Sequence, residues 1–153
     1  MAIITSLANL HTYIGQELGA SDWLVIGQER IDAFARATGD HQWIHVDAAR
    51  AARETPFGTT IAHGFLTLSL VSHLLRQVVQ ITGVQMTLNY GMNRVRFVAP
   101  VPAGSRVRAR VALADLQSIA DGAQATWSVA IEREGGTKPC VVAEWIVRYY
   151  TDR

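Results

Sequence analysis

The sequence predicts an α+β fold in which an antiparallel sheet wraps around one long buried helix. Gly64–Gln80 carries apolar side chains on every face of a helix, so a helix there must be enclosed by other elements. The second half of the chain alternates apolar and polar residues over several stretches, as strands with one buried face do. The compact way to combine these elements is a sheet curled around the helix.

Local signals mark the elements that precede the buried helix. A short strand is expected at Asp22–Val25. A helix follows over Gln28–Ala35, because Ile31 and Phe34 fall on one helical face. Gly39 ends this helix, since glycine readily adopts the backbone conformation that closes a helix.

A polar loop, Asp40–His45, comes after Gly39. A second short helix is expected at Ala48–Glu54, with Asp47 as its N-terminal cap. The turn-forming residues of the segment 55–58 then break the chain before the buried helix begins.

The strands of the second half show their buried faces by strict alternation. Arg106–Leu113 places apolar residues at every second position. Gly122 and Gly135-Gly136 stand where hairpin turns are expected. The apolar positions of the last two strands are Trp127, Val129 and Ile131, and Val141, Ala143, Trp145, Val147 and Tyr149.

Length and composition indicate one packed domain covering residues 1–153. The chain has 49% hydrophobic and 18% charged residues, which is typical of a globular protein. Its net charge of +1 gives no general attraction to nucleic acid, so a nucleic-acid partner is not expected. Cys140 is the only cysteine, so no intrachain disulfide can form and a cytoplasmic location is expected.

No membrane association is expected. The first ten residues are mildly apolar but lack a basic segment and a cleavage-like site, which favours a docking arm over a signal peptide. The longest apolar stretch, Phe65–Leu75, is interrupted by polar residues and is too short to span a bilayer.

The loop after Gly39 concentrates ionisable groups. Asp40, His41, His45 and Asp47 fall within eight positions. A carboxylate and an imidazole five residues apart, Asp40 and His45, can hold and deprotonate a water molecule. Two other interpretations stay open: Asp40 caps the following turn beside a structural histidine, or His41 and His45 chelate a metal. A loop disfavours the chelate, which needs a rigid scaffold, so no metal is expected.

Several motifs together resemble one family. They are Phe34, Thr38-Gly39-Asp40, Ile44-His45, Ile61-Ala62-His63-Gly64-Phe65, and Ser69 with Ser72. This set resembles the (R)-specific enoyl-CoA hydratases, the MaoC-like dehydratases of hot-dog fold, and is most similar to their NodN-like branch. The resemblance covers nearly the whole chain. One departure is Gln42-Trp43, where family members usually carry Asn-Pro.

The resemblance implies reversible hydration of trans-2-enoyl-CoA to (R)-3-hydroxyacyl-CoA in a homodimer, without a metal or a redox cofactor. It implies that Asp40 and His45 activate water and that the Gly64 amide stabilises the thioester enolate. A glycine at a helix start suits that role because free N–H groups lie there and no Cβ obstructs them. The resemblance further points to Ser72 as a group that orients Asp40, although Ser69 and Ser72 can equally bond back to their own helix.

Five arginines lie in a stretch that contains no acid: Arg94, Arg96, Arg106, Arg108 and Arg110. They alternate with apolar residues and so belong to the outer face of strands, where most arginines are simply solvated. The family binds CoA, whose phosphates arginine can bind, and Arg94 and Arg96 are the candidates for that contact.

Two other functions remain as alternatives. A hot-dog acyl-CoA thioesterase would direct water at the carbonyl instead of the β-carbon. A non-catalytic acyl-CoA-binding module would need neither Asp40 nor His45. The presence of both residues, with Ala62-His63-Gly64 downstream, favours the hydratase.

Overall fold

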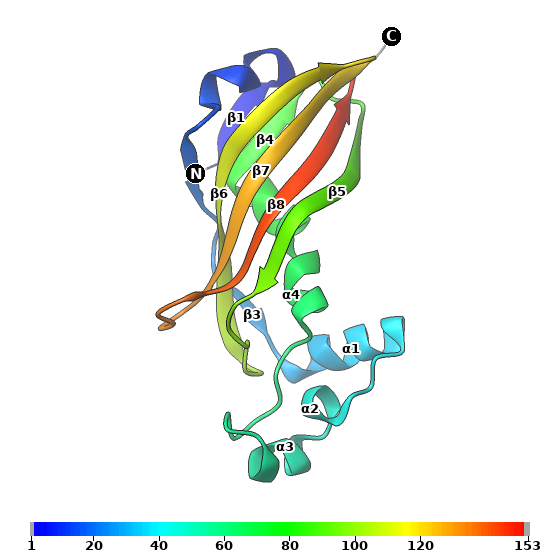
Figure 1. Cartoon of the computed structure of the whole chain (residues 1–153), viewed down its shortest axis with the longest axis vertical. Coiled ribbons are helices and arrows are strands. Elements are labelled where there is room, and N and C mark those ends of the chain that lie inside the picture. The colour runs from blue at the N-terminus through cyan, green and yellow to red at the C-terminus, as the bar shows by residue number, and fades with distance from the viewer. Residues whose placement is uncertain (1, 152–153) are drawn as a thin grey trace.

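The computed structural model of the chain describes residues 2–151 and contains a six-stranded antiparallel sheet (Figure 1). The strand order is β2, β6, β7, β8, β5, and β3 also pairs with β6. The bounds are β2 Glu17–Ala20, β3 Leu24–Ile26, β5 Met86–Phe97, β6 Ser105–Ile119, β7 Gly122–Arg133 and β8 Pro139–Tyr150. The predicted antiparallel sheet is therefore confirmed, including the hairpin turns at Gly122 and Gly135.

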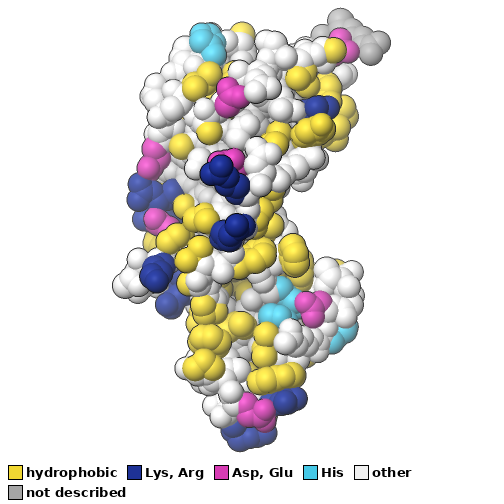
Figure 2. All heavy atoms as spheres, viewed as in Figure 1, with side chains coloured by type: hydrophobic (Ala, Val, Ile, Leu, Met, Phe, Trp, Pro, Cys, Tyr) yellow, Lys and Arg dark blue, Asp and Glu magenta, His cyan; other side chains and the backbone are white. Residues whose placement is uncertain are grey.

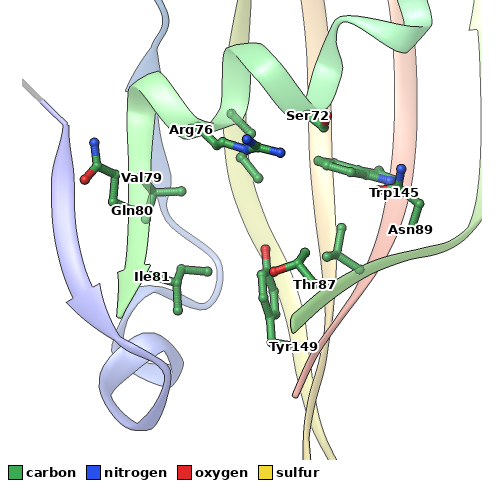
Figure 3. A pocket seen from close by; sticks show the side chains of 11 residues that line it. Ser72, Arg76, Val79, Gln80, Ile81, Thr87, Asn89, Trp145 and Tyr149 are labelled. Carbon is green, nitrogen blue, oxygen red and sulfur yellow. The ribbon is translucent and has the colours of Figure 1, made fainter. Parts of the chain in front are cut away.

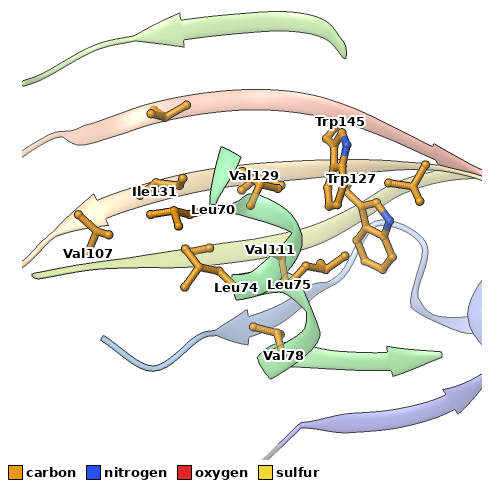
Figure 4. Packing of buried hydrophobic residues seen from close by; sticks show 14 of the residues in the cluster. Leu70, Leu74, Leu75, Val78, Val107, Val111, Trp127, Val129, Ile131 and Trp145 are labelled. Carbon is orange, nitrogen blue, oxygen red and sulfur yellow. The ribbon is translucent and has the colours of Figure 1, made fainter. Parts of the chain in front are cut away.

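The concave face of the sheet forms the main core with the central helical segment (Figure 4). Leu70, Leu74 and Leu75 pack there with the alternating apolar residues of β6, β7 and β8. Val129 and Ile131 lie on the buried face, as the sequence predicts. Burial of each such side chain contributes about 1.5–3 kcal/mol, so sheet and helix stabilise one another.

The prediction of one continuous helix over Gly64–Gln80 is wrong in its detail. The segment forms two helices, α4 (Gly64–Ser69) and α5 (Val71–Val78), which meet at Leu70. The Ser69 hydroxyl donates to the Leu66 carbonyl at 2.7 Å, a contact that often bends helices. The Leu70 amide accordingly bonds to Thr67 O, one residue short of helical spacing.

The C-terminal end of the predicted helix is a strand instead. Gln80 belongs to β4 (Val79–Thr82), which pairs in parallel with β1 (Ile3–Ser6). Between β1 and β2 lies the 3-10 helix η1 (Leu7–Tyr13), whose Leu10 is fully buried. The expected N-terminal arm thus packs against the rest of the chain. Among the described residues, no helix is long and apolar enough to cross a membrane.

Three short helices form an extension below the end of the sheet (Figure 1). They are α1 (Gln28–Thr38), α2 (Trp43–Val46) and α3 (Ala48–Glu54), here called the helical extension. Gly39 ends α1 in the left-handed conformation with φ 78°, as predicted. Asp47 caps α3 by accepting a hydrogen bond from the Arg50 amide at 2.9 Å, also as predicted.

Three boundaries differ from the prediction. The helix α1 continues beyond Ala35 to Thr38. The strand predicted at Asp22–Val25 is β3, Leu24–Ile26, because the Asp22 amide bonds to the Gln77 side chain and the pairing with β6 begins at Leu24. The segment Asp40–His45 is not entirely a loop, since the Asp47 amide closes a helical turn onto the Trp43 carbonyl.

Candidate active site

Asp40 and His45 lie close together in the structure, and His63 joins them. One atom from each side chain, a carboxylate oxygen or a ring nitrogen, lies within 4.8 Å of the other two. Asp40 follows α1, His45 lies in α2, and His63 precedes α4. Figure 2 shows histidine side chains at the waist of the molecule, between the sheet and the helical extension.

His45 is buried with one ring nitrogen engaged. Its side chain is 7% exposed, and Nδ1 lies 2.7 Å from the Ile61 carbonyl oxygen. A carbonyl can only accept, so Nδ1 carries the proton and Nε2 is the basic nitrogen. Burial lowers the pKa of His45 from its usual 6.5, and the His63 charge lowers it further, against the Ile61 hydrogen bond and the Asp40 charge. His45 is therefore a neutral base at pH 7.

Gln28 supports the backbone of His45 from the first turn of α1. Its Nε2 donates to the His45 carbonyl at 2.7 Å and to an Asp32 carboxylate oxygen at 2.9 Å. The buried Thr60 hydroxyl donates to the other end of the Gln28 amide. Every polar atom of this amide is thus used to hold the turn that carries His45. Gln28 was not predicted from the sequence, because no motif or periodicity distinguishes it.

Asp40 is exposed and makes a local turn. Its Oδ1 accepts a hydrogen bond from the Gln42 amide at 3.3 Å, and its own amide donates to the Thr38 hydroxyl at 3.4 Å. One carboxylate oxygen of Asp40 therefore caps the following turn, as one of the two alternative interpretations predicts. Within residues 2–151, no hydrogen bond to its second oxygen is present, so that oxygen is available to a water molecule.

His63 contacts both of the other residues and is 3% exposed. Its Nε2 is 3.0 Å from the Asp40 carbonyl oxygen. Its ring stacks on His45 with centroids 3.8 Å apart and an interplanar angle of 24°. The sequence analysis noted the Ala62-His63-Gly64 motif but gave His63 no role of its own.

Gly64 is the first residue of α4, and its amide donates to no other described residue. It lines a hollow of about 320 Å³ together with His45 and Phe97. A Cβ at Gly64 would lie 2.8 Å from Cδ1 of Phe97, so that ring occupies the space a side chain would need. The structure thus places the free Gly64 amide and His45 around one hollow.

Ser72 lies elsewhere. It lines a hollow of about 410 Å³ between α5 and the strands β5 and β8, together with Arg76, Asn89 and Trp145 (Figure 3). In the described part of the chain, no hydrogen bond links Ser72 to Asp40. The proposed orienting contact is therefore not present within one chain. Ser69 instead bonds back to its own helix.

Arg94 and Arg96 line a third hollow, on the outer face of the sheet, with Ser128 and Glu144. The Arg94 side chain is 81% exposed and lies 3.9 Å from Glu144. The Arg96 guanidinium donates to the neighbouring Val95 carbonyl at 2.8 Å and to no other described residue. The other three arginines form ion pairs at 3.0 Å or less: Arg106 with Glu134, Arg108 with Glu132 and Arg110 with Glu17.

Asp40, His45 and His63 are close enough together to be compared with a metal site. His41 does not belong to it. The rings of His45 and His63 stack with an interplanar angle of 24°, so the lone pairs, which lie in the ring planes, are poorly placed to meet at one ion. One nitrogen of each ring is already bonded to a carbonyl oxygen. This geometry suits holding a water molecule better than chelating an ion.

Three comparisons with known proteins agree. Residues 9–134 match the family described as MaoC like domain. The 3-hydroxyacyl-thioester dehydratase Z of Mycobacterium tuberculosis is 53% identical over 150 residues, covering 97% of this chain and 99% of that protein. Nodulation protein N of Rhizobium leguminosarum bv. viciae is 50% identical over 143 residues, covering 92% and 89%. The solved (R)-hydratase from A. caviae involved in PHA biosynthesis has a TM-score of 0.70 and 31% identity, covering 88% and 94%.

Proposed function

We propose that this chain, which belongs to the MaoC-like dehydratase family, catalyses the reversible hydration of trans-2-enoyl-CoA to (R)-3-hydroxyacyl-CoA. The family, its hot-dog fold and the relationship to nodulation protein N agree with the sequence-based prediction. The observation that carries the proposal is the basic Nε2 of His45 beside the Asp40 carboxylate.

The proposed chemistry moves one proton. A water molecule held by Asp40 and His45 adds its oxygen to the β-carbon while Nε2 of His45 takes one of its protons. The double-bond electrons shift into the thioester as an enolate. The imidazolium then delivers the same proton to the α-carbon. The second hydrogen of the water, held by Asp40, stays on the product hydroxyl.

The Gly64 amide is the proposed donor to the enolate oxygen. It lines the same hollow as His45, and it has no competing acceptor among the described residues. A donor fixed before the reaction stabilises the charge that develops in the transition state. The roles of Asp40, His45 and Gly64 are thereby distinct: the first two handle water and its proton, the third handles the carbonyl.

The CoA moiety is proposed to contact Arg94 and Arg96. Their guanidinium groups are exposed, and neither forms a close ion pair with a described residue. Both therefore remain available to phosphate oxygens.

The described residues share one hydrophobic core, which supports the proposal of a single domain.

The test of the proposal is an absorbance assay with crotonyl-CoA and a longer enoyl-CoA, followed by chiral analysis of the product. Loss of the conjugated thioester absorbance with an (R)-3-hydroxy product is expected. Release of free CoA thiol without loss of the double bond would identify a thioesterase instead. Binding without turnover of either kind would identify a non-catalytic module.

His45 gives the protein a predicted pH dependence of stability. Burial is the main cause that lowers the pKa of folded His45 from 6.5. As the pH falls, the unfolded chain therefore binds a proton at this imidazole before the folded chain does. The contribution of neutral His45 to the free energy of unfolding is complete above pH 6.5, the unfolded-state value. This contribution is lost as the pH falls through the lowered pKa of the folded state. We expect wild type to lose more free energy of unfolding than His45→Gln between about pH 7.5 and 5.5 in urea titrations. Equal losses would contradict this.

A homodimer is predicted from the open edge of the sheet. The edge strand β5 exposes Met86, Leu88 and Tyr90, and the side facing away from β8 has no partner strand in the described chain. A long apolar edge of this kind tends to pair with another chain. We expect sedimentation to give a dimer at micromolar concentration, with an interface that includes β5 and its arginines.

Leu88→Lys should shift this dimer toward monomer, because it places a charge on the edge. The matched control is Val25→Lys, which adds the same charge to an exposed apolar position on β3, at the opposite edge. A monomeric wild type, or equal dissociation by both variants, would argue against β5 as the interface.

A further inference from the structure

We propose that His63 is a positioning residue that holds the Asp40–His45 pair in its working geometry. The inference rests on the function proposed above for that pair. His63 contacts both members: its Nε2 lies 3.0 Å from the Asp40 carbonyl oxygen, and its ring stacks on His45 at 3.8 Å. The opposing segments of the site are thus joined through one side chain.

The stack restricts how the His45 ring can turn. Phe34 also contacts the His63 ring, with centroids 4.9 Å apart, so the His63 ring is held by two aromatic neighbours, Phe34 and His45. A His45 ring that lies flat on His63 and donates from Nδ1 to Ile61 has one orientation for Nε2. That orientation is what a shared water molecule requires, because proton transfer depends on hydrogen-bond geometry.

The contacts of His63 show which of its ring nitrogens is the donor. A carbonyl oxygen only accepts, so Nε2 donates to Asp40 and carries the proton. The other nitrogen, Nδ1, is buried and has no hydrogen-bond partner among residues 2–151. The titratable groups that act on His45 are His63 and Asp40, and both are in contact with the stacked pair of rings.

The unpartnered Nδ1 of His63 also indicates that this histidine does more than fill space in the core. A buried polar atom without a partner destabilises the folded protein, and an aromatic hydrocarbon ring would fill the same place without that cost. Packing alone therefore does not favour histidine here. Histidine is favoured because it supplies both the Nε2 donor and the ring stack. Phenylalanine would supply only the stack, and glutamine only the donor.

The test compares His63→Phe and His63→Gln with His41→Gln, a control on an exposed histidine next to Asp40. We expect His63→Phe to keep or raise the melting temperature but to lower kcat at least about tenfold, with KM changed less than about twofold. His63→Gln should lower kcat and also shift the acid limb of the pH profile, because His45 loses its stacked neighbour. His41→Gln should behave like wild type.

A His63→Phe variant with wild-type kcat would overturn the inference. So would a loss of activity that only follows the fraction of folded protein, with kcat per folded molecule unchanged. If wild type hydrates no enoyl-thioester, the proposed function fails, and nitrogen NMR of the imidazoles still decides the role of His63. Wild type should then show His45 as a single Nδ1–H tautomer that becomes mixed in His63→Gln, which removes the stack, and stays single in His63→Phe, which keeps it. An unchanged tautomer in His63→Gln would refute the positioning role.

Discussion

Asp40→Asn and His45→Gln are each expected to lower kcat/KM for hydration by about 10²- to 10⁴-fold, the range typical for loss of one proton-transfer group. Asparagine can still accept from the Gln42 amide but carries no charge to hold an imidazolium. Glutamine can donate to the Ile61 carbonyl but has no basic nitrogen. The absorbance of the enoyl-thioester at saturating and limiting substrate gives both constants.

The matched controls are Asp22→Asn and His73→Gln, the same changes at exposed positions outside the site. They should retain wild-type rates. The double variant of Asp40 and His45 should be about as damaged as the worse single variant, because residues that share one water molecule act as a unit. Near-normal turnover in either single variant, with the fold intact, would remove the pair from the mechanism.

The sequence spacing could predict that Asp40 and His45 lie close together, because few residues separate them. Residues five positions apart span at most about 17 Å even in an extended chain, and the turn that Asp40 makes with Gln42 shortens that span. His63 and Gln28 are different. Their contacts with the pair span 23 and 17 residues, so they exist only once the helical extension has packed against the start of α4. No local pattern encodes a ring stack between distant segments.

The fold likewise combines features that local sequence predicts with features that depend on contacts between distant segments. Alternation predicted the buried faces of the strands because pleating fixes the direction of each side chain. Apolar content predicted that Gly64–Gln80 is enclosed, but it could not predict the break at Leu70 or the strand at Val79. The first depends on a hydroxyl contact within the turn, and the second on pairing with β1 near the other end of the chain.

Gly64→Val is expected to lower kcat by about 10²- to 10³-fold, the typical loss when one enolate donor is removed. A side chain there blocks the thioester from the amide. It also meets Phe97, whose Cδ1 lies 2.8 Å from the position of a Cβ. Gly64→Ala is the gentler variant, since the Phe97 side chain is 47% exposed and its ring can turn outward. Melting temperature should be followed for both, to separate misfolding from lost catalysis.

A double-mutant cycle with Phe97→Ala separates the two causes. If Gly64→Ala is slow only because it displaces Phe97, removing the ring in the double variant should restore the rate of the Phe97→Ala single variant. If the Cβ obstructs the thioester, the double variant should stay slow, and this is the expected result. Ser72→Ala should be milder than either glycine variant, because Ser72 lines the hollow beside Trp145 and not the one that contains His45. Greater damage from Ser72→Ala than from Gly64→Val would mean that the thioester carbonyl binds beside Ser72 instead.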